Sequence, residues 1–255
     1  MAFAASETIA SDLIGELNVL LASARYIQIE SIVIKKLLQG AAQLMNADPS
    51  QANLIKAAIY LLCADVEKVE YHLRLANNLP SSNTPNLHLN SSVALSNLSL
   101  YSKSQEFFFK INDLTTVELF EFIDGGLGSL SITRMNELFV KAEKMKLQLD
   151  HPKIELISKA ANVLRNNNIS DVDVAKYADV FGELLRENRI MIKGEHPDIV
   201  VGDSSNNWHP ETVFITFKIE TDVVGATKLY KEGMKRLLSE YKDFPEYLHF
   251  SIEAH

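Results

Sequence analysis

The chain has few of the residues that break helices and almost none that could form a disulfide. Its 255 residues include 7 prolines, 10 glycines and one cysteine, Cys63. A single cysteine excludes an intramolecular disulfide and a cysteine-based metal cluster. Scarce proline and glycine favour a mainly helical protein, because both residues destabilise helix interiors.

Two further absences narrow the class of protein. No segment is a long apolar run, and residues 1–7 lack the basic start of a secretory signal. We therefore expect a cytoplasmic protein with no membrane partner. The net charge is −8, so the chain has no excess of positive charge for gripping nucleic-acid phosphates. We expect no direct nucleic-acid partner, no cofactor and no bound metal.

What the chain does contain is a repeated helical pattern. Three segments spaced 35 residues apart place packing residues at offsets of 0, 3, 7 and 10, which is one stripe of a helix. A small residue precedes each stripe, on the helix before it: Ala22, Ala57 and Ser92. Such a period predicts stacked helical hairpins. The stripes are Ser31, Ile34, Leu38 and Ala41; Val66, Val69, Leu73 and Ala76; and Tyr101, Ser104, Phe108 and Ile111.

The middle segment carries the most specific version of this pattern. Ala57 and Tyr60 provide a small and an aromatic residue on its first helix, and Leu73 and Ala76 provide a large and a small residue on its second. In these positions it resembles a tetratricopeptide repeat, and the resemblance extends over residues 6–112. The departures are Val69 for a small residue, Asn53 for a tryptophan, Arg25 for a tyrosine, and a period one residue longer than usual.

The resemblance implies a non-enzymatic interaction module or adaptor that binds another protein or a peptide. The first helix of each hairpin lines the groove of such an array. Asparagine side chains suit this role because they hydrogen-bond an extended peptide backbone. The basic residues of a carboxylate clamp are missing. The groove positions carried over from the family are Gln51, Leu54, Ala58, Asn86, Leu89, Asn90, Val93 and Asn97.

The character of the chain changes near Arg189. Alternating and β-branched residues predict strands over 189–193, 198–201, 212–219 and 247–252. A helix begins after Asp222, with Val224, Leu229, Met234, Leu237 and Leu238 as its apolar residues. We therefore predict a mainly α protein: stacked helical hairpins over residues 1–188, then a small α/β domain over residues 189–255. That domain would be a four-stranded sheet with one helix, in the order βββαβ, its first three strands forming a meander.

This order of elements is similar to the core of the PD-(D/E)xK nucleases, which gives an alternative function. Asp198 would be the first acid and Lys218 the lysine of the third strand. Thr216 stands where that family requires a second acid. A further alternative is an acidic inhibitor of a nucleic-acid-binding or defence protein, which only the net charge supports.

The run Gly125-Gly126-Leu127-Gly128 has the composition of a phosphate-binding loop. It follows a helical stretch, not a strand, and no lysine comes after it. We therefore predict a flexible helix end with glycines in the left-handed conformation.

Overall fold

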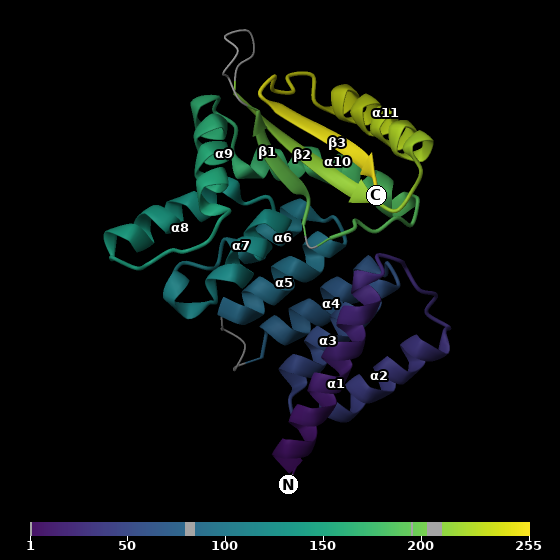
Figure 1. The fold of residues 1–255 in the computed structure, drawn as a ribbon. Coiled ribbons are helices and arrows are strands. Elements are labelled where there is room, and N and C mark those ends of the chain that lie inside the picture. The colour runs from purple at the N-terminus through teal and green to yellow at the C-terminus, as the bar shows by residue number, and fades with distance from the viewer. Residues whose placement is uncertain (1, 80–84, 195, 203–210) are drawn as a thin grey trace.

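The computed structural model describes residues 2–79, 85–194, 196–202 and 211–255, and it confirms a mainly α protein with a small C-terminal α/β part (Figure 1). The helices before the sheet are α1 (Ala2–Ala22), α2 (Ile32–Leu44), α3 (Pro49–Leu62), α4 (Val66–Asn77), α5 (Pro85–Asn97), α6 (Tyr101–Phe108), α7 (Leu119–Gly128), α8 (Ile132–Lys144), α9 (Ile154–Asn166) and α10 (Asp171–Glu187). Among the described residues, no helix has both the length and the apolar character needed to cross a membrane.

Consecutive helices pair and stack. Helix α3 packs against α4, and α5 packs against α6. Helix α3 also contacts α1 and α5, while α5 contacts α7, so these helices follow one another across the molecule (Figure 1). The three predicted stripes begin at the starts of α2, α4 and α6 and run along these helices, the last one continuing to Ile111 beyond α6. Most of their residues are buried. The periodic pattern therefore locates the packing faces of these helices.

The small residues predicted at the hairpin contacts are buried in two segments of the three. Ala57 and Ser92 are fully buried, and the Ser104 hydroxyl donates to the Ser92 carbonyl oxygen at 2.7 Å. Ala22 is exposed, so the prediction is wrong in the first segment. There α1 and α2 meet earlier along α1, where Leu13 packs against Gly40.

Most of the helices end without glycine. Seven non-glycine residues that closely follow a helix have φ between 50° and 61°. After Lys146, for example, the N–H of Leu147 donates a hydrogen bond to the carbonyl oxygen of Ala142 at 3.0 Å, as in a Schellman motif. The scarcity of glycine is thus compatible with many helix ends. The seven residues are Ala24, Ala64, Ser99, Leu130, Lys146, Asn168 and Arg189.

The glycine-rich run lies at the C-terminal end of α7, as predicted, but its glycines are not left-handed, so that part of the prediction is wrong. Gly125, Gly126 and Gly128 lie within α7 and are buried, and the left-handed residue is Leu130. A β-carbon on Gly126 would lie 2.2 Å from the sulfur of Met135. Gly125 and Gly126 therefore allow neighbouring side chains to approach the α7 backbone closely.

The C-terminal part contains β1 (Asp198–Gly202), β2 (Thr212–Ile219), α11 (Val223–Glu240) and β3 (Leu248–Ala254). The strand order is β1-β2-β3, with β1 antiparallel and β3 parallel to β2. Within the described residues, the sheet has three strands rather than the predicted four. Residues 189–193 form only isolated bridges, Ile190 with Arg25 and Ile192 with Ile219. The positive φ values of Arg189 and Gly194 turn the chain at both ends of this short segment.

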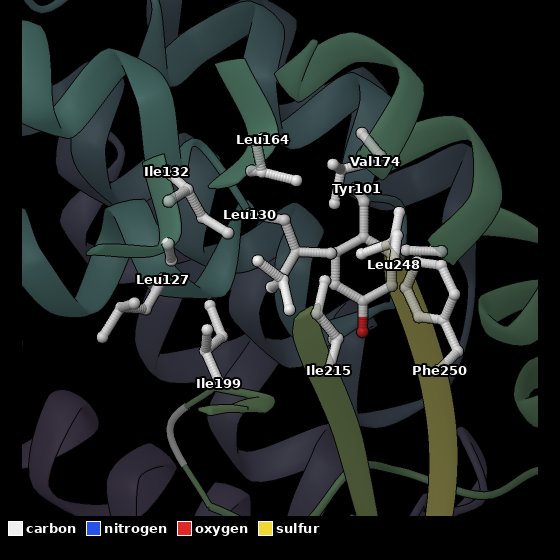
Figure 2. Close-up of a cluster of buried hydrophobic side chains, with 14 of the residues drawn as sticks. Tyr101, Leu127, Leu130, Ile132, Leu164, Val174, Ile199, Ile215, Leu248 and Phe250 are labelled. Carbon is white, nitrogen blue, oxygen red and sulfur yellow. The ribbon is translucent and has the colours of Figure 1, made fainter. Parts of the chain in front are cut away.

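One hydrophobic cluster joins the sheet to the helices. Tyr101, Leu130 and Leu164 from the helical part belong to it together with Ile215 and Leu248 of the sheet (Figure 2). The change of secondary structure near Arg189 therefore lies inside a continuous core, not between two cores. A second cluster is formed by α1, α2 and α3, and a third lies mainly between α3, α4 and α5.

Helix α10 organises this core through charged side chains at the ends of other helices. Two buried or half-buried aspartates accept from the free N–H groups of helix N-termini, and an arginine donates to carbonyls after a helix C-terminus. The bonds join Asp171 to the N–H groups of Thr133 and Arg134 (2.9 Å each), Asp179 to that of Tyr101 (2.6 Å), and Arg186 to the carbonyls of Leu98 and Ser99 (2.9 and 2.6 Å). Burial raises the pKa of both aspartates.

Candidate partner-binding surfaces

The predicted groove residues of α3 are only partly exposed to a binding partner. Gln51, Leu54 and Ala58 are all half-buried. Leu54 packs against the cluster between α3, α4 and α5, and Ala58 packs against the cluster of α1, α2 and α3. Stacking of the neighbouring helices thus covers part of this face.

The predicted groove residues of α5 divide into two groups. Asn86 and Asn90 are exposed, and Val93 is half-buried. Leu89 is 2% exposed, because α7 stacks on α5 and its Gly125 lies against the Leu89 side chain. Leu89 is therefore removed from the set that could contact a partner.

Asn97 lies elsewhere, where α5 meets the segment before the sheet. It is half-buried and lines a very small cavity together with Gly128 of α7 and His196. The imidazole of His196 is held there by Lys153, whose amino group lies 2.7 Å from Nε2 and 3.2 Å from a carboxylate oxygen of Asp124. These contacts make Asn97 part of a junction between elements.

The structure brings Asp198 and Lys218 together on the face of the sheet that points away from the hydrophobic cluster. Their side chains form an ion pair at 2.5 Å. The hydrogen bond to the Asp198 carboxylate raises the pKa of Lys218. The Thr216 hydroxyl lies 2.7 Å from that of Ser251. The described residues hold no group of three or more histidine, cysteine or acidic side chains placed to bind a metal. This geometry provides a neutralised charge pair on a strand surface.

A different surface, which the sequence did not reveal, lies between α10 and α11. A trough of about 790 Å³ runs along the two helices, with Leu184 of α10 and Asn188, which follows α10, on one side. Val223 and Val224, at the start of α11, are 73% and 77% exposed beside it. Leu238, one of the last residues of α11, is 53% exposed.

Between these apolar ends, α11 presents lysines. Among the described residues, no carboxylate lies within 4.0 Å of the amino groups of Lys228, Lys231 or Lys235. The acid of the trough, Glu232, is paired with Arg236 at 3.1 Å. We name this surface the α11 strip and define it as Val223, Val224, Lys228, Lys231, Lys235 and Leu238.

The local sequence explains why these residues are left outside. Helix α11 buries a narrow side made of Ala226, Gly233 and Leu237. Gly233 lies against the ring of Phe181, so α11 sits close to α10. Of the apolar residues that the sequence places on this helix, Val224 and Leu238 are exposed, whereas Leu237 is buried. The signal that could have found the surface was the presence of two small residues, Ala226 and Gly233, on the opposite side.

Comparisons of the chain with models of protein families, with curated proteins and with solved structures found no match.

Proposed function

We propose that the protein is a non-enzymatic interaction module that binds another protein, and that the α11 strip is its main docking surface. The observation that carries this proposal is the pair of adjacent valines, Val223 and Val224, both more than 70% exposed beside a trough. Single exposed apolar residues are ordinary on protein surfaces. A cluster of them, rimmed by polar groups and beside a hollow, is typical of an interaction site.

The chemistry of the trough favours a protein over a small molecule. Small-molecule sites are concave and bury most of the ligand, with a few convergent polar groups. Here the valines and Leu238 stand at opposite ends of one helix, and long lysine side chains lie between them. Burying one valine side chain contributes about 1.5–3 kcal/mol, so two of them would anchor a partner.

The exposed part of the helical array offers a second surface under the same proposal. Asn86 and Asn90 lie in the first half of α5 and remain exposed in the folded chain. Their amide groups can donate to and accept from a peptide backbone. The two surfaces lie on different helices, so one experiment can separate them.

Site-directed photo-crosslinking tests the proposal. A photoreactive amino acid is placed at Thr227, which lines the trough, at Asn90 on α5, and at the exposed Gln39 of α2 as the matched control. The full chain is irradiated in the cells that produce it, and crosslinked proteins are identified by mass spectrometry. We expect one discrete product from Thr227 and none from Gln39.

Each outcome of this experiment has a defined meaning. A product from Asn90 alone would move the docking surface to the helical array. The same products from all three positions would show non-specific contact. No product from Thr227 or Asn90 would contradict the protein-binding function.

A further inference from the structure

Resting on the protein-binding function proposed above, we infer that the α11 strip takes an acidic amphipathic helix of the partner protein. Its carboxylates pair with Lys228, Lys231 and Lys235, and its apolar residues cover the valines and Leu238. The charge, the residue spacing and the shape of the strip favour this occupant.

The α11 strip is positively charged, whereas the whole chain is acidic. The protein carries a net charge of −8, yet these three lysines have no carboxylate partner among the described residues. Nearby Arg236 shows the alternative, because it is held by both Glu187 and Glu232 at 2.9 and 3.1 Å. An acidic partner segment would give the lysines the pairing that Arg236 has within the fold. Charge complementarity of this kind sets specificity and association rate.

The spacing of the strip residues along α11 indicates how long the partner helix is. Lys228, Lys231 and Lys235 recur at intervals of three and four residues, so they lie along one side of α11. Val224 and Leu238 are 14 positions apart, which is about 21 Å along a helix. A partner helix of roughly four turns covers that length.

The shape of the site favours a helix as the occupant. The trough is bounded by two packed helices, α10 and α11, whose side chains form ridges and grooves. A third helix can lie in such a groove with its apolar face inward, as in other helix-in-groove complexes. Nucleic acid would satisfy the lysines but would leave the valines uncovered, and the acidic remainder of the chain would repel its phosphates.

A designed peptide tests the inference with the full-length protein. The probe is a fluorescein-labelled 18-residue helical peptide with leucines on one face and glutamates beside them. A second peptide has lysine in place of every glutamate. Binding is measured by fluorescence anisotropy at low and high salt. We expect the acidic peptide to bind, the basic peptide not to bind, and affinity to fall as salt rises.

Paired variants locate the site. K231E with K235E should weaken binding of the acidic peptide about tenfold or more, because the charge complementarity is reversed. V223S with V224S should weaken it to a similar degree by removing the apolar anchor. The controls are K35E with K36E, and I32S with V33S, which change exposed lysines and exposed apolar residues of α2. The control variants should bind the acidic peptide as the unmodified chain does, and circular dichroism should show every variant folded.

The outcomes separate this inference from the proposed function. A protein crosslinked at Thr227 together with no binding of the acidic peptide would overturn the acidic helix and leave protein binding in place. So would binding that survives charge reversal at Lys231 and Lys235. A duplex DNA competitor that displaces the peptide and binds more tightly would also overturn the inference.

Discussion

Gly182 of α10 lies directly against the backbone of Ser99, in the turn between α5 and α6. A β-carbon on Gly182 would lie 2.1 Å from the Ser99 carbonyl oxygen, closer than any real contact. The same carbonyl accepts from Arg186 at 2.6 Å, and Ser99 itself has a φ of 54°. Helix α10 is therefore fixed to the helical array through backbone contact, which only glycine allows.

Gly182→Ala should destabilise the protein by about 1–3 kcal/mol, the usual range for overpacking a close contact. The neighbouring atom is a backbone oxygen in a constrained turn, so it cannot move aside as a flexible side chain could. Denaturant unfolding measures the change. Gly15→Ala is the matched control, because Gly15 lies in α1 with nothing within 4 Å of an added β-carbon. That change should stabilise the protein by about 0.5–1 kcal/mol. Equal effects of the two variants would contradict the close contact.

Glycine should stabilise the protein at the positions after helices where the backbone is left-handed. Lys146 is exposed and has a φ of 61°, a conformation that costs a residue with a β-carbon about 1–2 kcal/mol. Part of the gain from glycine is offset by its larger backbone entropy when unfolded, so Lys146→Gly should stabilise by about 0.5–1 kcal/mol. Glu143→Gly, within α8, should instead destabilise by about 1 kcal/mol. Thermal melts of the two variants should shift in opposite directions.

The local periodicity of the sequence was enough to predict most of the helical part. The stripe of Val69, Leu73 and Ala76 is buried in the structure, because a 3.6-residue period marks the inner face of a helix wherever the chain folds. The strand predicted at residues 189–193 failed for a non-local reason. Its pairing depends on where α10 ends and on which neighbours lie within reach, Arg25 and Ile219, and composition does not specify them.

Less of the candidate site than of the fold could be predicted from the sequence. The sequence identifies Val224 and Leu238 as apolar residues of the last helix, but their burial depends on how α11 rotates against Phe181. The resemblance to the repeat family places Leu89 in a groove, but the packing of α7 on α5 buries it. In both cases the exposed face was decided by a contact between helices distant in sequence.

Leu73→Ala tests the repeat alignment. Leu73 is 1% exposed in the cluster that α3, α4 and α5 build, so the truncation leaves a cavity. We expect a loss of about 2–5 kcal/mol in the free energy of unfolding. Leu238→Ala is the control, since that leucine is 53% exposed and should change stability by less than about 0.5 kcal/mol. A similar small effect at Leu73 would show that the stripe does not face the core.

The pH dependence of stability should reveal Asp171. Burial raises its pKa, and the N–H groups of Thr133 and Arg134 oppose this only in part. A raised folded pKa means that the stabilising contribution of the carboxyl is complete below the ordinary aspartate pKa and is lost as pH rises through the raised value. The stability of the unmodified chain, relative to Asp171→Asn, should therefore increase as pH falls from 7 toward 4.

Asp113 supplies the control with the opposite sign. Hydrogen bonds from the backbone and hydroxyl of Thr115 lower its pKa. The contribution of Asp113 is therefore present above the ordinary aspartate pKa and lost as pH falls through the lowered value. Relative to Asp113→Asn, the unmodified chain should lose stability on acidification. Urea unfolding at a series of pH values measures both differences, and parallel trends would contradict the assigned directions.

Ending the chain at Asn188 tests how far the two parts depend on each other. Removal of the sheet would expose Tyr101 and Phe181, whose rings pack against Phe217 at 5.8 and 5.7 Å. The cluster of α1, α2 and α3 contains none of the described residues beyond position 188 and should persist. Circular dichroism should show helix that melts with lower cooperativity than the full chain. Hydrogen exchange should be fast in α6–α10 and remain slow in the first hairpins. Slow exchange throughout α6–α10 would instead show that the helical part folds as an independent domain, as the change of sequence character at Arg189 predicts.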